Sequence, residues 1–124
     1  MEADKMRKKI ESDQKNILVV DDDKSVRTTF SSVLRKEGYR VTAVENGYEA
    51  IKAIDEESFD LALVDLRMPG LDGIEVLEKI KSRRPKTRVI IYTGYGSVTT
   101  AVEAIRKGAA DYLSKPFSPE ELKG

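Results

Sequence analysis

The sequence predicts an α/β domain built on a doubly wound sheet of five parallel strands. Short apolar runs alternate along the chain with segments whose apolar residues recur at helical spacing. The connections between them are short, which favours right-handed crossovers and therefore a parallel sheet. At 124 residues, the chain is long enough for one domain with one hydrophobic core.

Five segments have the pattern of strands. The first, third and fourth are apolar runs typical of buried strands, the second alternates, and the fifth is short. The predicted strands are residues 17–20, 39–44, 60–64, 88–92 and 111–114.

A predicted helix follows each of the first four strands, and each helix has one apolar face. Asn46 and Glu49 are placed to form a capping box at the second helix, and Ser97 caps the fourth. Gly38 and Gly108 follow the first and fourth helices, and the third ends before Pro85. The inward faces are Val26, Phe30, Val33 and Leu34 in the first helix, Ala50, Ile51 and Ile54 in the second, Ile74, Leu77 and Ile80 in the third, and Val98, Ala101, Val102 and Ile105 in the fourth.

These elements predict a flavodoxin-like domain over residues 16–124 with strand order 2-1-3-4-5. The segment 118–121 has the cap, proline and acidic residue of a helix start. Only a short stretch of chain follows it, so we expect the helix after the fifth strand to be truncated.

Residues 1–15 form a charged N-terminal extension with two interpretations. It is either a disordered tail or a helix over residues 3–14. In the second case Ala3, Met6 and Ile10, which lie at helical spacing, would pack on an exposed sheet face or on a partner chain.

Composition excludes several classes of function. The chain has no Cys and no His, which excludes disulfides, thiolate chemistry and a triad with a His base. Any metal must be a hard cation held by oxygen, and Mg²⁺ fits best. The 22 basic residues balance the 22 acidic residues, so there is no bulk attraction to nucleic acid. With no membrane-length apolar stretch and no signal-peptide pattern, we expect no membrane partner and a cytoplasmic location.

The predicted strands deliver polar side chains to one edge of the sheet. Asp65 follows the third strand, and the aspartates at 21–23 follow the first. Thr93 follows the fourth strand and Lys115 the fifth. Because ligands bind at the carboxyl edge of open α/β sheets, we expect these groups to hold a divalent cation and a phosphoryl group.

Each of these side chains has a task in phosphoryl transfer to a carboxylate. Asp65 would be the nucleophile, and Asp21 and Asp22 would join it in holding Mg²⁺, without which the three carboxylates would repel one another. Lys115 and Thr93 would each meet a phosphoryl oxygen. Taken singly, an Asp run is more often a helix cap, a Thr at a strand end is usually structural, and a Lys before Pro is usually solvated. The prediction depends on their coincidence at consecutive strand ends.

Over residues 16–121 the chain resembles a receiver domain of a two-component response regulator. Residues 17–23 are similar to the first strand and acidic pair of that family, and residues 64–73 are similar to its phosphoacceptor loop. Thr93 and Lys115 follow Asp65 by 28 and 50 residues, as they would in the family. The segments 93–98 and 111–117 are most similar to receivers of enhancer-binding transcription activators.

The resemblance implies that Asp65 accepts a phosphoryl group from the phosphohistidine of a sensor histidine kinase. It also implies that Asp22 and Asp65 bind Mg²⁺ directly, that Asp21 binds it largely through water, and that the backbone carbonyl of Arg67 is a further ligand.

The resemblance further implies that Thr93 and Tyr112 form a switch pair. Phosphorylation would change the surface made by helix 97–107 and strand 111–114, which would control an output domain or protein. Receivers often dimerise through that surface, so the resemblance also allows a homodimer, which the sequence itself does not decide.

No strong base is visible to activate water, so we expect a long-lived phosphorylated form. The chain would then be no turnover enzyme and would catalyse only its own phosphorylation and slow dephosphorylation. Arg67 and Tyr95, two residues after Asp65 and Thr93, would tune the lifetime of the phosphoryl group.

Two other classes compete with this interpretation. A magnesium-dependent aspartyl-phosphate phosphatase also uses Asp, Thr and Lys at strand ends, but it needs an acidic group two residues after the nucleophile, where this chain has Arg67. A flavin- or nucleotide-binding module would have a Gly- or Ser/Thr-rich turn after the first strand, where the aspartates at 21–23 would repel a phosphate.

Overall fold

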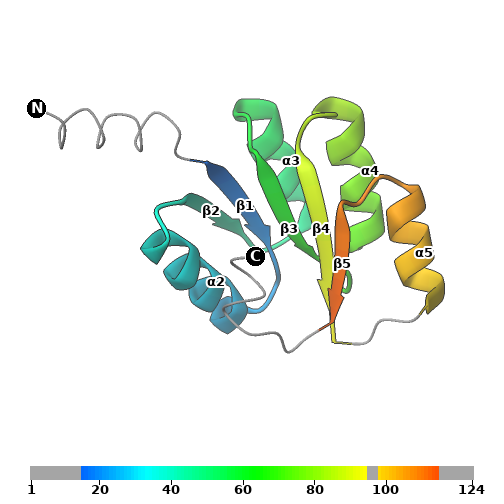
Figure 1. The fold of residues 1–124 in the computed structure, drawn as a ribbon, viewed down its shortest axis with the longest axis horizontal. Coiled ribbons are helices and arrows are strands. Elements are labelled where there is room, and N and C mark those ends of the chain that lie inside the picture. The colour runs from blue at the N-terminus through cyan, green and yellow to red at the C-terminus, as the bar shows by residue number, and fades with distance from the viewer. Residues whose placement is uncertain (1–14, 95–97, 115–124) are drawn as a thin grey trace, which may run out of the picture.

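The computed structural model describes residues 15–94 and 98–114, in which five strands alternate with four helices. The sheet is parallel throughout, with the order β2-β1-β3-β4-β5 (Figure 1), so the predicted fold class and strand order are confirmed. In chain order the elements are β1 (Asn16–Val20), α2 (Lys24–Lys36), β2 (Arg40–Val44), α3 (Gly47–Glu56), β3 (Leu61–Asp65), α4 (Gly73–Arg83), β4 (Arg88–Thr93), α5 (Val98–Arg106) and β5 (Asp111–Ser114).

An apolar cluster lies on each face of the sheet. Helices α3, α4 and α5 cover one face and α2 covers the other (Figure 1). Successive side chains of a strand point to opposite faces, so neighbouring residues of β1, β3 and β4 join different clusters. The cluster under α3, α4 and α5 includes Val20, Val64 and Ile91, and the cluster under α2 includes Val19, Leu63 and Tyr92. The carboxyl ends of these three strands are therefore supported from both sides.

Side-chain caps begin three of the helices near the carboxyl edge of the sheet. Asp23 caps α2 by accepting backbone N–H bonds, and Asn46 caps α3 by accepting from the N–H of Glu49 at 2.9 Å. At this second helix the structure shows the Asn46 half of the predicted capping box. The reciprocal pair is found at α4, where Asp72 and Glu75 each accept from the other's backbone N–H.

The predicted inward face of α5 is partly wrong. Val102 and Ile105 were expected in the core, but they are 43% and 50% exposed. Ala104 is fully buried instead, and Ala101 is half-buried. Helical spacing shows which residues share a face, but here the face turned toward the core is the one that carries Ala104.

Several predictions fall on residues outside the described ranges. They include the helix over residues 3–14, the helix start at 118–121 and the Ser97 cap of α5. The division into an extension at 1–15 and a domain at 16–124 stays a prediction. Among the described helices, none combines the length and the hydropathy needed to cross a membrane.

Gly73 begins α4 where no side chain fits. A Cβ atom at this position would lie 2.5 Å from the backbone oxygen of Asp65 and 2.7 Å from the Cα of Leu66. The Gly73 N–H also donates to the Leu66 carbonyl at 2.9 Å. This close approach holds the start of α4 against the end of β3.

We expect Gly73→Ala to lower the free energy of unfolding by about 3 kcal/mol, because the obstructing atoms belong to the backbone and cannot rotate away. Urea denaturation measures this loss. The matched control is Gly38→Ala, where φ is +94° and no atom lies within 4 Å of the added Cβ. Backbone strain alone should cost this variant about 1 kcal/mol. Equal losses in the two variants would contradict the close approach at Gly73.

Candidate functional site

Three carboxylates gather at the carboxyl edge of the sheet. Asp21 and Asp22 follow β1, Asp65 ends β3, and each offers an oxygen that lies within 4.8 Å of the other two. Asp21 and Asp65 are buried, with 0% and 6% exposure, whereas Asp22 is exposed. Val20 and Val64 are paired in the parallel register, so Asp21 and Asp65 come next at the same level. The sheet thus brings together carboxylates that are distant in the chain.

Both carboxylate oxygens of Asp21 accept hydrogen bonds from the protein. The backbone N–H of Asp23 donates to Oδ1 at 2.8 Å, and the hydroxyl of Tyr92 donates to Oδ2 at 2.9 Å. Burial, followed by the charge and hydrogen bond of Asp21, raises the pKa of Tyr92 far above its usual range. The phenol therefore keeps its proton and serves as a donor. These bonds offset part of the cost of burying a carboxylate away from water.

The backbone after Asp65 is held close to its carboxylate. The N–H of Arg67 donates to Asp65 Oδ1 at 3.3 Å, and the N–H of Leu66 continues the sheet ladder by donating to the Tyr92 carbonyl at 2.9 Å. The loop then passes to Gly73 at the start of α4. Asp65 therefore lies between a sheet edge and a loop that are both fixed by backbone hydrogen bonds.

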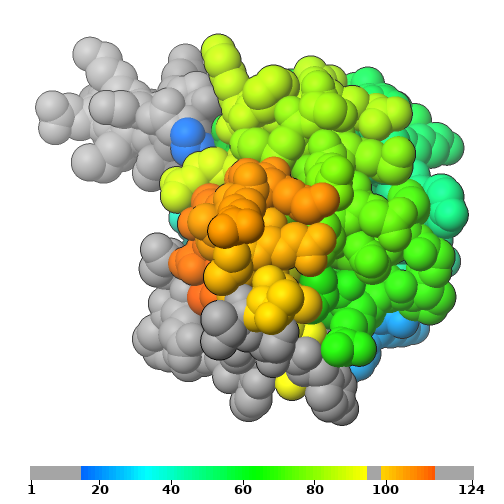
Figure 2. Space-filling view, turned by 90° about the vertical axis from the view of Figure 1, so that its right-hand side faces the viewer, coloured from blue at the N-terminus to red at the C-terminus, as the bar shows by residue number. Residues whose placement is uncertain are grey.

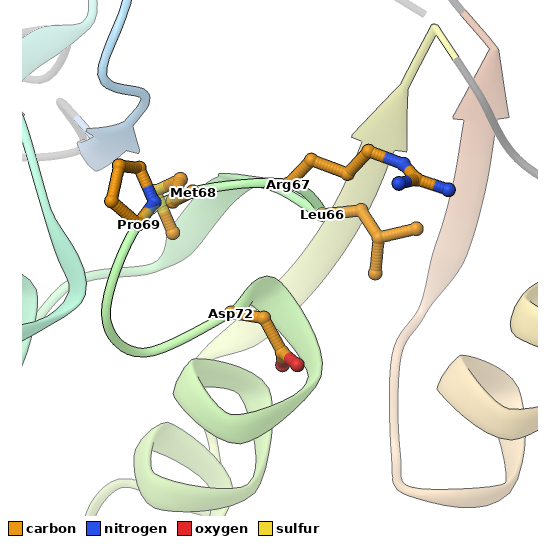
Figure 3. A pocket seen from close by; sticks show the side chains of 5 residues that line it. All are labelled: Leu66, Arg67, Met68, Pro69 and Asp72. Carbon is orange, nitrogen blue, oxygen red and sulfur yellow. The ribbon is translucent and has the colours of Figure 1, made fainter.

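A pocket of about 490 Å³ lies along this loop (Figure 3). Figure 3 shows the side chain of Arg67 directed away from Pro69, toward the ends of β4 and β5. The lining residues do not include the three carboxylates, so the pocket borders the cluster rather than containing it. It is lined by Leu66, Arg67, Met68, Pro69 and Asp72.

The two predicted switch residues lie on neighbouring strands. Thr93 ends β4 at the same edge as the carboxylates and is 1% exposed. Tyr112 on β5 is half-buried and packs against the cluster under α3, α4 and α5. Its hydroxyl forms a 2.8 Å hydrogen bond with Thr100 Oγ1 of α5. This bond joins the strand that pairs with β4 to the helix at the surface.

The carboxylate cluster suits a hard divalent cation. Mg²⁺ prefers oxygen ligands at about 2.1 Å, and three carboxylate oxygens within 4.8 Å of one another lie close enough to share one ion after small side-chain shifts. The chain has no Cys or His, so its charged donors are oxygens only. Without a cation the buried carboxylates would repel one another, and a bound cation would relieve that repulsion.

The structure brings together some of the predicted site residues and leaves others untested. Asp21, Asp22 and Asp65 form one cluster, and the Arg67 backbone lies beside it. Lys115 and Tyr95 fall outside the described residues, so their places at the site stay predictions.

Sequence reasoning missed two polar contacts, those of Tyr92 and Thr100. Tyr92 ends an apolar run, which hides the polar tip of a mostly buried side chain. Its predicted position next to Thr93 could have indicated that Tyr92 lies near the site. The structure shows why, because Tyr92 pairs with Asp65 in the sheet register. Thr100 carried no such signal, since only the packing of α5 on β5 brings it to Tyr112.

Comparison with known proteins agrees with this arrangement of fold and carboxylates. The family described as the response regulator receiver domain matches residues 17–124, and the chain belongs to that family. Its members act in phosphorylation-dependent signalling by two-component systems.

One relative is the transcriptional regulatory protein ZraR of Klebsiella oxytoca, which is 49% identical over 111 residues. The match covers 90% of this chain and 25% of the relative, so the chain spans about a quarter of the length of this curated relative. The predicted likeness to receivers of transcription activators is confirmed.

Solved structures agree with the fold. The crystal structure of a CheY-like receiver domain protein from Methanospirillum hungatei superposes with a TM-score of 0.86 at 37% identity, covering 89% of this chain and 88% of that one. A response regulator from Burkholderia pseudomallei, crystallised with a phosphorylated aspartic acid, a calcium ion and citrate, gives a TM-score of 0.84 at 34% identity. That match covers 89% of this chain and 65% of the other.

Proposed function

We propose that this receiver domain is a switch that accepts a phosphoryl group on Asp65 from the phosphohistidine of a sensor histidine kinase, in a reaction that needs Mg²⁺. One observation carries the proposal. Asp65 is almost fully buried at the tip of β3, within 4.8 Å of two further carboxylates, an arrangement in which like charges repel unless a cation lies among them. The Burkholderia relative, crystallised with a phosphorylated aspartic acid and a calcium ion, supports phosphorylation of an aspartate in this family.

The transfer requires little covalent chemistry from the protein. An Asp65 oxygen forms a bond to phosphorus while the phosphorus–nitrogen bond of the donor breaks, and the leaving imidazole nitrogen keeps the electron pair. The protein supplies position and charge. Thr93 at the end of β4 would donate to one phosphoryl oxygen, and Lys115 would contact another as a point charge.

Mg²⁺ would be held by Asp22 and Asp65 directly, by Asp21 largely through water, and by the backbone carbonyl of Arg67. When bound, it neutralises charge on the transferring phosphoryl group. The exposure of Asp22 leaves one side of the cluster open to solvent, from which the ion and the donor can enter.

Incubation with acetyl phosphate and Mg²⁺ should add one phosphoryl group to the protein, because a small donor can replace the kinase when the acceptor supplies the positioning. Intact-mass spectrometry measures the gain. Asp65→Asn should abolish it, and EDTA should abolish it in the wild-type protein.

The matched control is Asp55→Asn, which removes an exposed carboxylate paired with Arg83 on the helices α3 and α4. This variant should gain the phosphoryl group as the wild-type protein does. Phosphorylation that survives in Asp65→Asn would refute the assignment of the acceptor.

We also propose that the domain is no turnover enzyme and that it catalyses only its own phosphorylation and a slow dephosphorylation. The chain has no histidine, the side chain that most often activates water as a general base. Arg67, two residues after Asp65, and Tyr95, two residues after Thr93, would then set the lifetime by limiting the access of water.

Replacing Arg67 by Asn, or Tyr95 by Ala, should shorten the half-life of the phosphorylated protein several-fold, because a smaller side chain admits water more easily. Decay of the phosphorylated species in Mg²⁺, after acetyl phosphate has been removed by gel filtration, is followed by intact mass and measures the half-life. Arg88→Asn is the control, since Arg88 is exposed at the amino end of β4, away from the site. Half-lives that do not differ across the three variants would contradict lifetime tuning at these positions.

The output surface is proposed to comprise α5 and β5. Figure 2 shows α5 at the surface beside α4, and its exposed Val102 and Ile105 provide apolar area for a partner. This partner would be an output domain, an output protein or a second copy of the domain. Because basic and acidic residues balance, the chain has no net charge to attract nucleic acid, and we propose no direct contact with it. A sensor kinase as phosphoryl donor implies a cytoplasmic location.

The switch would pass from Thr93 to this surface through Tyr112, whose hydroxyl is bonded to Thr100 of α5. Contact of Thr93 with a phosphoryl group would favour a conformation in which Tyr112 turns inward and gives up this bond. The phosphoryl group thus biases two states that exist beforehand.

Thr100→Val should move the unphosphorylated protein toward the phosphorylated conformation, about fivefold in the equilibrium constant, because it removes a neutral hydrogen bond worth about 1 kcal/mol. Fluorine NMR of protein labelled with fluorotyrosine measures the shift at Tyr112. Thr100→Ser keeps the hydroxyl and should keep the wild-type spectrum. A Tyr112 resonance that is the same in the Val and Ser variants would show that this bond does not hold the switch.

A further inference from the structure

Tyr92 links the carboxylate cluster to the apolar cluster under α2. Its side chain is fully buried, and its ring packs edge-on against Phe30 of α2 with the ring centroids 5.1 Å apart and the planes at 75°. The other end of the same side chain donates its hydroxyl to Asp21 Oδ2 at 2.9 Å. One residue thus joins a packed interior to a charged group at the sheet edge.

The sheet register explains how Tyr92 reaches the site. Tyr92 pairs with Asp65 across β3 and β4, so the two side chains leave the sheet on the same face. The ring then fills the space beneath the edge, and only the hydroxyl extends to the carboxylates. A phenylalanine in the same place would keep the packing and lose the contact with Asp21.

Asp21 is oriented by donors on two sides. The backbone N–H of Asp23 donates to Oδ1 at 2.8 Å, and the Tyr92 hydroxyl donates to Oδ2. Each oxygen of a carboxylate has a second lone pair, and with both oxygens held, the directions of those lone pairs are set. A ligand whose direction is set in advance needs no ordering when the metal binds.

We propose that Tyr92 is a positioning residue of the metal site, which holds the Asp21 carboxylate in the orientation that a divalent cation or its bound water requires. This rests on the proposed Mg²⁺ site at Asp21, Asp22 and Asp65. Groups that hydrogen-bond to metal ligands commonly change metal affinity by about 10- to 100-fold when they are removed. Tyr92 acts through Asp21 and does not contact the ion or the phosphoryl group itself.

Isothermal titration of the metal-free protein with MgCl₂ alone tests this proposal without phosphorylation. Tyr92→Phe should bind Mg²⁺ about tenfold more weakly than the wild-type protein. Tyr92→Met, which also lacks the donor, should show a loss of the same order. Tyr39→Phe is the matched control, because Tyr39 packs half-buried in the same apolar cluster, and this variant should bind as the wild type does.

A double-mutant cycle separates positioning from a general loss of structure. In the Asp21→Asn background, Tyr92→Phe should cause no further loss of affinity, because the oriented carboxylate is already gone. Equal affinities of the wild-type and Tyr92→Phe proteins would overturn the role of Tyr92 and leave the metal site standing. A tenfold loss that persists in the Asp21→Asn background would overturn it as well. No Mg²⁺ binding by the wild-type protein would overturn the proposed metal site together with this inference.

Discussion

The rest of the structure depends on holding two buried carboxyl groups side by side at the carboxyl edge of the sheet. Asp21 and Asp65 lie at the tips of adjacent strands with almost no exposed surface, and Asp22 adds a third charge from the solvent side. Burial of charge is costly, and like charges at this distance repel. The protein offsets this cost with donors such as the Asp23 N–H and the Tyr92 hydroxyl. The remaining repulsion between these carboxyl groups is what a cation at the proposed site would relieve.

Such a cluster needs a scaffold that does not relax away from it. The three strands that meet at the edge carry apolar residues into clusters on both faces, so their tips cannot separate without opening the core. Two of the helices that begin next to the edge are capped by an aspartate, Asp23 at α2 and Asp72 at α4. The close approach at Gly73 then fixes the loop after Asp65. Packing, capping and steric contact thus hold the same few backbone segments.

The sequence predicted the parts that follow from periodicity and from order along the chain. Alternating elements predicted the strand order, and the ends of the apolar runs predicted that Asp21, Asp22 and Asp65 would meet. Periodicity failed at α5, because an apolar stripe shows that Val102 and Ile105 share a face and does not show whether the sheet or a partner covers it. Spacing likewise did not distinguish the partial cap at Asn46 from the reciprocal pair at Asp72 and Glu75. The role of Tyr92 was missed because a hydrophobic pattern treats tyrosine as an apolar residue. Its role depends instead on the hydrogen-bond partner of its hydroxyl, which only the structure shows.

The two tyrosine hydroxyls differ in a way that matters for a switch. Tyr92 donates to a buried charge, and such a bond typically contributes about 1.5–3 kcal/mol, so it should persist in every state of the domain. Tyr112 shares a neutral hydrogen bond with Thr100 at a half-buried position. Such a bond contributes about 0.5–1.5 kcal/mol, and water can replace the partner. In the proposed switch, contact of Thr93 with a phosphoryl group would exchange the neutral Tyr112 bond more readily than the Tyr92 bond, because the neutral bond is the weaker of the two. In that switch, the face under α2 would be the rigid side of the site, and the face that carries α5 would be the side that responds.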